Sequence, residues 1–467
     1  MRRFAVVGDG ISGLVAAYRL RQALGDEATI DLFGAGDHPG GILKTVPVGG
    51  APVDVGAEAF IVRRPEALGL VTELGLADQV VSPTANRPAI WADGRLHAMP
   101  TGALMGIPAD ADSVIGLVDA ADRERIAGER HRPLSWAPGT DVSVGDLVTE
   151  RYGPSVVARC VDPMLGGVYS SLAADIGLRE AIPALAARLD AGAPSLSAAV
   201  TEVLGLSRGV AGPVFGTLQG GYRVLVEALL AAAHPHLRSG STVTDIERSG
   251  ARWTLLTAQG SADAGPAYDG VVLAVPAWAA GAILRRTDAD LAAQLRAVQG
   301  ASSVVASMAF APDTPVPQHS GVLVATGESL RAKAFTLSSR KWAHLMRPDR
   351  PVSVRASFGR YGAAIPEEDA QPGITEQITG WALADFDEVC GAAGLPAPSG
   401  RLVDIRLQRW TNGLPVYAPG HLTRMAAAIA ACPPGLALAG ASYAGVGVPA
   451  CVGRAGRAVT EVLGALD

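Results

Sequence analysis

The stretch that decides the expected fold lies near the amino terminus and reads Val6-Val7-Gly8-Asp9-Gly10-Ile11-Ser12-Gly13. It follows residues 3–7, a short apolar run typical of a strand, and precedes residues 14–21, whose apolar side chains recur at helical spacing. Gly8 permits a tight bend, Gly10 lets the backbone approach a pyrophosphate, and Gly13 lets the helix pack closely on the strand. A strand, a glycine turn and a helix in this order predict a dinucleotide-binding βαβ unit.

The second strand of this unit departs from the usual pattern at its end. The strand is expected at residues 28–33, and such strands usually end in an acidic residue that binds the adenosine ribose. Here the position just before Ala35 is Gly34. Asp31 is expected on the opposite strand face, so Asp37 in the following loop is the plausible substitute. We therefore predict that Gly34→Glu tightens dinucleotide binding, unless Asp37 or the backbone already fills that role.

The composition indicates a globular protein of more than one domain. The chain has 467 residues, more than one compact core usually holds, with 49% hydrophobic and 18% charged residues. A net charge of -6 without a basic stripe argues against nucleic-acid partners. The four cysteines lack metal-ligand spacing, so we expect no metal site, no disulfide scaffold and a reducing, cytoplasmic location. They are Cys160, Cys390, Cys432 and Cys451.

Two apolar stretches are not expected to target or anchor the chain. The run that begins at Phe4 is interrupted by Gly8 after only four residues, which is unlike a signal peptide. Residues 425–453 are uncharged but contain Pro433, Pro434 and many glycines, a pattern typical of strand, loop and helix start. We therefore expect no membrane span.

The pattern along the rest of the chain predicts an α/β protein with a discontinuous nucleotide-binding domain. Helical segments separated by proline and glycine dominate one long region, β character then returns, and a second set of strands follows. We expect the nucleotide-binding domain at residues 1–85, 205–285 and 400–467, a helical insertion at residues 86–204, and a substrate-binding sheet domain at residues 286–399.

Two further segments resemble a known superfamily. They are Gly40-Gly41-Ile42-Leu43-Lys44-Thr45 and Asp54-Val55-Gly56-Ala57-Glu58-Ala59-Phe60. A GG turn soon after the second strand, followed by a basic residue and a threonine, is similar to the second pyrophosphate contact of the flavin amine oxidases. The resemblance implies an α/β fold with a Rossmann-like FAD-binding domain, an α+β substrate-binding domain and a helical insertion.

Within that superfamily the chain most resembles the protoporphyrinogen and coproporphyrinogen oxidases of the Gram-positive and actinobacterial type. The resemblance runs nearly end to end and rests on the segments 99–108, 162–169, 217–222, 409–421 and 440–451. The last segment discriminates best, because a GxSYxGxGxPxC run passes the flavin ring in the resembled enzymes. The alternative interpretation is an ordinary loop in a glycine-rich protein.

The resemblance implies FAD as the cofactor and assigns its contacts. These are Gly8, Gly10, Ile11, Ser12, Gly13, Gly34, Ala35, Gly41, Lys44, Thr45, Gly56, Ala57, Glu58, Ala59, Val243, Trp410, Val446, Gly447 and Val448. Val243 lies on an expected strand whose backbone can pair with an adenine edge. Trp410 is expected either to wall the flavin or to be a core residue.

The activity that the resemblance implies is oxidation of coproporphyrinogen III to coproporphyrin III in haem biosynthesis. Six electrons leave in three steps, molecular oxygen reoxidises the flavin, and no acid–base residue is assigned. The alternatives are protoporphyrinogen IX as substrate, another flavin oxidase acting on amines or polyenes, and a non-catalytic haem-pathway scaffold. Transient contact with a ferrochelatase is expected, and the oligomeric state stays open between monomer and homodimer.

The substrate's propionate groups need cationic partners, and an arginine suits a carboxylate because its guanidinium is forked. Arg87 is the leading candidate, because its segment is similar to one that supplies such an arginine in the resembled enzymes; the alternative is a solvated surface charge. Gly167 is expected to let the backbone approach the macrocycle. Leu323 and Phe335 are expected to sandwich its rings, unless they are simple core residues.

Overall fold

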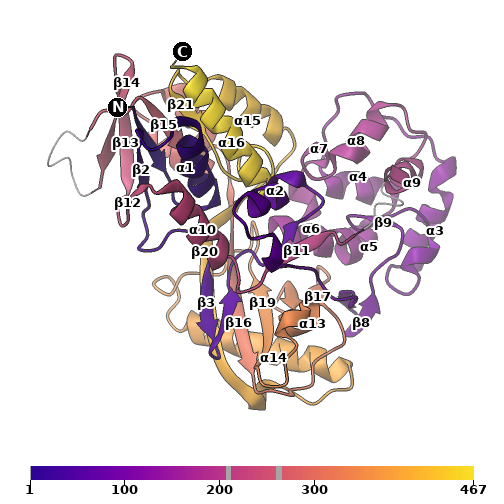
Figure 1. The fold of residues 1–467 in the computed structure, drawn as a ribbon. Helices are drawn as coiled ribbons and strands as arrows, with labels where there is room; N and C mark the ends of the chain where they lie inside the picture. Colours follow the sequence, from indigo (N-terminus) through magenta and orange to yellow (C-terminus); the bar gives the residue numbers. More distant parts are fainter. Residues whose placement is uncertain (1, 207–211, 259–265, 467) are drawn as a thin grey trace.

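The computed structural model describes residues 2–206, 212–258 and 266–466, which form three adjoining regions (Figure 1). The first region is built on a parallel five-stranded sheet in the order β12-β2-β1-β15-β21. Its strands are β1 (Arg3–Val7), β2 (Thr29–Phe33), β12 (His236–Arg238), β15 (Gly270–Leu273) and β21 (Leu436–Leu438). Parallel neighbours require crossover connections, and α1 (Ile11–Leu24) supplies the one between β1 and β2.

Helices cover both faces of this sheet, and β1, β15 and β21 are therefore buried on both sides. One hydrophobic cluster joins α1 to α2 (Pro65–Glu73), α10 (Arg223–Ala233) and α16 (Val448–Gly464). A second cluster, on the other face, joins α11 (Ala277–Ile283), α12 (Ala289–Arg296), α15 (His421–Ala430) and the hairpin of β13 (Val243–Ser249) and β14 (Arg252–Thr257).

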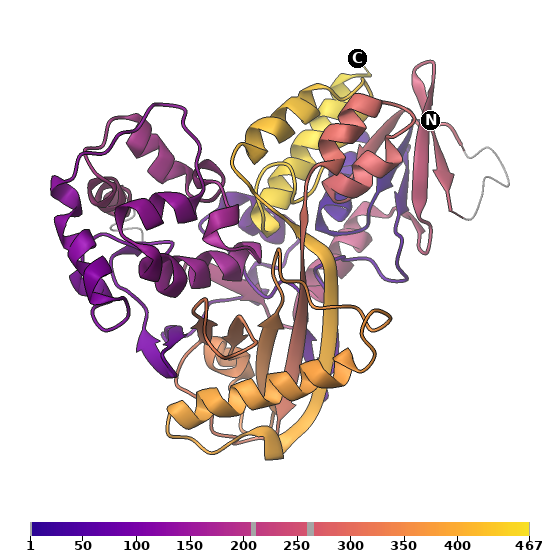
Figure 2. The same cartoon turned by 180° about the vertical axis from the view of Figure 1, so that it is seen from behind.

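The second region is a seven-stranded sheet in the order β20-β16-β19-β18-β17-β7-β8. The long helix α14 (Ile374–Ala392) lies across one of its faces, as seen from behind in Figure 2. The strands are β7 (Ala89–Ala92), β8 (Arg95–Ala98), β16 (Gly300–Phe310), β17 (Gly321–Val324), β18 (Ala334–Thr336), β19 (Val352–Phe358) and β20 (Leu402–Pro415), with α13 (Ser338–Lys341) after β18.

The third region is helical and has its own hydrophobic core. Its helices are α3 (Ala120–Gly128), α4 (Val144–Arg151), α5 (Pro154–Val156), α6 (Asp162–Tyr169), α7 (Leu178–Ala181), α8 (Pro183–Asp190) and α9 (Leu196–Leu206), with the short strands β9 (Ala103–Leu104) and β10 (Ile107–Pro108). Short elements link the regions: β3 (Thr45–Val48), β4 (Ala51–Asp54), β5 (Phe60–Ile61), β6 (Val80–Val81) and β11 (Phe215–Leu218).

Four elements lie outside the boundaries expected from the sequence. Strands β7 and β8, expected in the helical insertion, and β20, expected in the nucleotide-binding domain, belong to the seven-stranded sheet. Helix α12, expected in the sheet domain, packs with the parallel sheet. The sequence pattern indicates that a segment is a strand or a helix, but the partner against which it packs is non-local and leaves no local signal. None of the helices in the described ranges is both long and apolar enough to cross a membrane.

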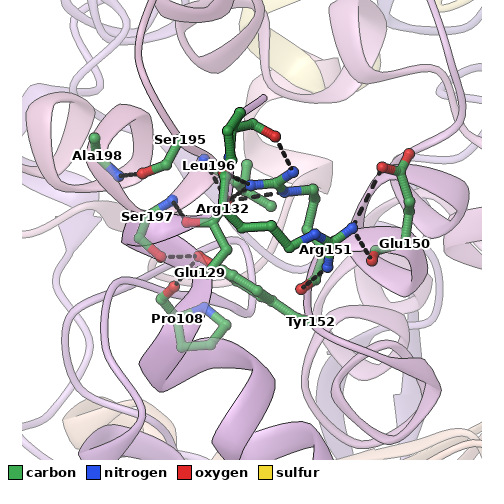
Figure 3. Close-up of polar contacts among 11 residues, drawn as sticks. Pro108, Glu129, Arg132, Glu150, Arg151, Tyr152, Ser195, Leu196, Ser197 and Ala198 are labelled. Atoms are coloured by element: carbon green, nitrogen blue, oxygen red, sulfur yellow. Dashed lines mark hydrogen bonds and ion pairs between the residues drawn. The ribbon is translucent and has the colours of Figure 1, made fainter. Parts of the chain in front are cut away.

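A buried ion pair organises the helical region (Figure 3). The guanidinium of Arg151 donates to Oε1 of Glu129 at 2.9 and 2.7 Å, and both side chains are almost fully buried. The carboxylate of Glu129 also accepts the amides of Leu196 at 2.8 Å and Ser197 at 2.9 Å. These are amides of the first turn of α9, which lack partners within the helix. One carboxylate therefore caps α9 and neutralises Arg151.

We expect Glu129→Gln to destabilise the protein by about 3–5 kcal/mol, because it leaves the buried Arg151 without a counter-charge. The measurement is urea-induced unfolding at neutral pH. Glu150→Gln is the matched control, since Glu150 is exposed and only 3.6 Å from the exposed Arg132, and it is expected to cost less than about 1 kcal/mol. Equal losses in the two variants would contradict this account.

The same carboxylate predicts a pH dependence of stability. Burial opposes ionisation of Glu129, but the Ser197, Arg151 and Leu196 bonds outweigh it and hold the pKa below its ordinary value of 4.5. A depressed pKa in the folded state stabilises the fold above pH 4.5, and this contribution is lost as the pH falls further. In Glu129→Gln this acid-sensitive part of the unfolding free energy should be absent.

Candidate functional site

The first glycine turn joins β1 to α1 and has no room for side chains. Gly8 adopts a φ of +106°, and a Cβ there would lie 2.5 Å from the Ala274 carbonyl oxygen. A Cβ on Gly13 would lie 1.7 Å from the Gly8 carbonyl oxygen. The tight bend expected of Gly8 and the close packing expected of Gly13 are therefore both present.

The second glycine turn touches the first. Gly40 pairs with Gly10, and a Cβ on Gly41 would lie 3.0 Å from the Gly10 Cα. Gly10 caps α1 without a side-chain hydrogen bond, and no acidic residue lies in the first turn. The first-turn amides of Ile11, Ser12 and Gly13 therefore suit an anion such as a pyrophosphate, because the first amides of a helix have no partners within it.

The end of β2 lies beside the start of the β13 hairpin. The Gly34 amide donates to the Arg238 carbonyl at 3.1 Å, and the Ser241 amide donates to the Gly34 carbonyl at 2.8 Å. This arrangement places Gly34 and the exposed Ala35 near the buried Val243, at the edge where an adenosine is expected. Asp31 is fully buried and bonded to Arg238 and Tyr268, so its carboxylate points away from the expected adenosine position, as predicted.

Gly56 and Trp410 meet where the parallel sheet joins the seven-stranded sheet. The Trp410 indole donates to the Val55 carbonyl at 3.0 Å, and a Cβ on Gly56 would lie 2.9 Å from Cζ2 of this indole. A guanidinium nitrogen of Arg355 donates to the Gly56 carbonyl at 2.6 Å. Trp410 and Arg355 therefore hold the segment that includes Ala57, and the role of Arg355 had no signal in the sequence.

The side chain of Glu58, a residue expected to contact the cofactor, is bonded within the protein. Its carboxylate pairs with Lys341 at 2.8 Å, accepts a hydrogen bond from Ser338 and lies 3.8 Å from Arg355. Burial opposes ionisation, but Lys341 and Arg355 outweigh it and hold the Glu58 pKa at about 2. Glu58 thus fastens the nucleotide-binding region to the second sheet. Its neighbour Ala59 precedes β5.

Thr45 is likewise engaged within the protein. Its hydroxyl donates to Asp54 and accepts the Arg223 amide at 3.0 Å, and the Tyr222 amide also donates to Asp54 at 3.0 Å. Burial is the main cause that raises the Asp54 pKa to about 6. Lys44 differs, since its side chain is exposed and its carbonyl accepts the Val55 amide at 2.9 Å.

The run that includes Val446, Gly447 and Val448 ends at α16 and lies against α1. Gly447 caps α16 with a φ of 93°, and Cys451 of α16 is buried in the same hydrophobic cluster as Ile11 of α1. A second helix amino terminus therefore joins the first beside the glycine turns. The two glycine turns and the two helix amino termini fit the pyrophosphate of FAD.

Two buried aromatic residues that the sequence did not single out hold this run. The Tyr417 hydroxyl accepts the Gly445 amide at 2.8 Å and donates to the Ala441 carbonyl. The His421 ring contacts the Ser442 carbonyl at 2.7 Å and stacks on Tyr417 at 4.3 Å between centroids. Both residues occur in the 409–421 segment, which carried the family resemblance without indicating their partners.

Leu323 and Phe335 lie on opposite faces of the seven-stranded sheet, so the prediction that they sandwich a substrate is wrong. Phe335 is 1% exposed, pairs across the sheet with Val322, and packs against Phe386 of α14 with centroids 5.5 Å apart. Leu323 pairs with Ala334 on the other face. Alternation along each strand separates the two side chains.

The face that carries Leu323 also carries a row of side chains aligned across the sheet. Cross-strand pairing aligns Ile90, Leu323, Ala334, Ser357, Val305 and Gln408 across six adjacent strands. Helix α6 approaches the row, because a Cβ on Gly167 would lie 3.8 Å from Leu323. Arg355 lies two residues before Ser357, on the same face, and reaches Gly56. The row therefore lies between α6 and the segment at Gly56.

Basic residues near this face also include Arg87, which precedes β7, and Lys333, which precedes β18. Arg87 is exposed, and its carbonyl accepts the Ser320 amide at 3.2 Å. Lys333, which the sequence did not single out, is buried, and its amine donates to Ser170 and, at 2.7 Å, to the Gly359 carbonyl. Burial lowers the pKa of Lys333 to about 7.

The comparisons with known proteins agree with this geometry. The family model for flavin containing amine oxidoreductases matches residues 11–463. Coproporphyrinogen III oxidase of Mycobacterium leprae (strain TN) is 45% identical, over 98% of this chain and 97% of the relative. The coproporphyrinogen III oxidase of Mycobacterium tuberculosis (strain ATCC 25618 / H37Rv) is 46% identical, over 100% and 98% respectively.

A solved structure supports the same assignment. The crystal structure of a protein provisionally named protoporphyrinogen oxidase, from Exiguobacterium sp. 255-15, matches with a TM-score of 0.84 and 26% identity. The match covers 99% of this chain and 98% of the other. The glycine turns, the two helix amino termini and these relatives lead to one assignment. The chain belongs to the flavin containing amine oxidoreductase family and is an FAD-dependent oxidoreductase.

Proposed function

We propose that this protein oxidises coproporphyrinogen III to coproporphyrin III in haem biosynthesis. Six electrons leave in three two-electron steps, and three molecules of oxygen accept them to give three of hydrogen peroxide. The observation that carries the proposal is the 45–46% identity to mycobacterial coproporphyrinogen III oxidases, over nearly the full length of both chains. The proposal includes a cytoplasmic location and a transient contact with a ferrochelatase.

The face of the seven-stranded sheet that carries the half-buried Leu323, Ala334 and Ser357 is the surface that we propose for a flat macrocycle. Its row includes the small side chains of Ala334 and Ser357, and the absence of a side chain at Gly167 leaves the backbone of α6 close to Leu323. FAD, when bound, supplies the acceptor for the two electrons of each step. The residues of this face then hold the substrate in place and exclude water, which is the main demand of such a reaction.

The cations near this face favour a substrate with several carboxylates. Strand residues rise about 3.3 Å each, so Arg87 stands roughly 10 Å from Ile90, which is level with Leu323. Arg87 is exposed just before the start of β7, and we propose that it binds a propionate of the macrocycle at this edge of the sheet. Coproporphyrinogen III has four carboxylates and protoporphyrinogen IX has two, and this difference supports the first as substrate.

The function is tested by supplying the purified holoenzyme with coproporphyrinogen III, protoporphyrinogen IX and a panel of amines and polyenes. Porphyrin fluorescence and peroxide release are measured together. We expect coproporphyrinogen III to give the highest kcat/KM, with three peroxides for each porphyrin. Turnover of amines or polyenes alone would contradict the proposal, and flavin-free protein without turnover would favour a scaffold.

We expect Arg87→Ala to raise KM for coproporphyrinogen III by on the order of ten-fold and to leave kcat and flavin content unchanged, because a charge-assisted bond to a propionate is lost. The measurement is steady-state kinetics. Arg2→Ala is the control, since the exposed Arg2 precedes β1, at the opposite end of that strand from the glycine turn. An unchanged KM in Arg87→Ala would assign Arg87 to the solvated surface.

A further inference from the structure

The carboxylate of Asp9 occupies the space that a side chain at residue 34 would take. A Cβ built on Gly34 would lie 2.0 Å from Oδ2, 2.6 Å from Cγ and 3.2 Å from Cβ of Asp9. The two residues follow neighbouring parallel strands, β1 and β2, in which Val7 pairs with Phe33. Both positions therefore lie at the carboxyl edge of the sheet, where the adenosine half of a dinucleotide binds.

The backbone does not require glycine at position 34. Gly8 has a positive φ, which disfavours other residues, whereas the φ of Gly34 lies outside that range. What excludes a side chain at Gly34 is the space taken by Asp9. A side chain at position 34 would therefore collide with the Asp9 carboxylate as it stands here, and one of the two would have to move.

The Asp9 carboxylate is incompletely bonded within the protein. Its Oδ2 atom is buried and has no hydrogen-bond partner among the residues that the structure describes. Burial raises the Asp9 pKa above its ordinary value. A buried carboxylate oxygen without a partner costs free energy, and ribose hydroxyls would supply the missing donors.

We propose that Asp9 supplies the carboxylate that binds the adenosine ribose of FAD, from the first glycine turn instead of from the end of β2. The proposal rests on FAD binding alone and is independent of the substrate. Asp31 is excluded because Arg238 and Tyr268 bind it on the other side of β2. Asp37 is exposed, three residues beyond the position that Asp9 fills.

This assignment reverses the expectation that Gly34→Glu tightens cofactor binding. The new Cβ would collide with the Asp9 carboxylate, and a second carboxylate would stand beside the first. In Gly34→Glu we therefore expect weaker FAD binding. Asp9→Gly combined with Gly34→Glu removes the collision and returns one carboxylate to the end of β2.

The experiment is a double-mutant cycle on the holoenzyme, with the FAD dissociation constant taken from flavin fluorescence released on dilution. We expect Asp9→Gly to weaken binding on the order of ten- to a hundred-fold, the usual range for a hydrogen bond to a charged group, and Asp9→Asn to weaken it less. Gly34→Glu alone should also weaken it. The double variant should return to within about three-fold of the unaltered protein.

Asp37→Asn is the matched control, because it removes one carboxylate from the neighbouring loop and should leave FAD affinity unchanged. Circular dichroism and thermal unfolding of each variant separate loss of fold from loss of affinity, and Asp9→Asn keeps the shape of the side chain. An FAD analogue with a 2′,3′-dideoxyadenosine half should bind the unaltered protein and Asp9→Gly with similar affinity.

Three results would overturn the proposal. The first is FAD binding by Asp9→Gly that equals or exceeds that of the unaltered protein, which would show that Asp9 gives nothing or repels the pyrophosphate. The second is tighter binding in Gly34→Glu alone. The third is a double variant that binds no better than Asp9→Gly. Each measurement needs no substrate, so failure of the proposed oxidation would leave this test intact.

Discussion

The contact between the first turn of α1 and the glycine turn is the constraint on which the site depends. A Cβ on Gly13 would overlap the Gly8 carbonyl, so only glycine lets the helix begin directly against the end of β1. That closeness directs the first-turn amides to the sheet edge. The second glycine turn then packs on Gly10, and α16 packs against α1 in one hydrophobic cluster. Each later part of the site is positioned relative to this contact.

Two ion-pair networks give the three regions their firm geometry. Glu58 ties the nucleotide-binding region to the second sheet through Lys341 and Arg355, and Arg355 also holds the Gly56 carbonyl. Glu129 performs the equivalent task inside the helical region. Charges that are buried and fully bonded add little net stability compared with apolar packing, but they fix a single arrangement. The site is assembled from three regions, so a fixed relative position of these regions matters more for it than added stability.

The sequence predicted the βαβ unit and the two glycine turns because those signals are local and each glycine has a steric reason. It did not predict that β7 and β20 complete the second sheet, since strand partners are non-local. The sequence indicated that Leu323 and Phe335 line the same site. Which face of a sheet a residue occupies depends on the exact register of its strand, and sequence places strand bounds only within a few residues. The sequence also indicated that the ribose-binding acid is missing at Gly34, because the carboxylate of Asp9 lies beside this position only in the folded structure.

The collision between side chains at positions 9 and 34 has an evolutionary consequence. A lineage that moves between the two arrangements passes through a form with either no carboxylate or two crowded ones. Both intermediates bind cofactor less well, so the effect of each substitution changes sign with the residue at the other position, a case of sign epistasis. The two sites are therefore expected to covary among relatives, with an acid at one and glycine or another small residue at the other.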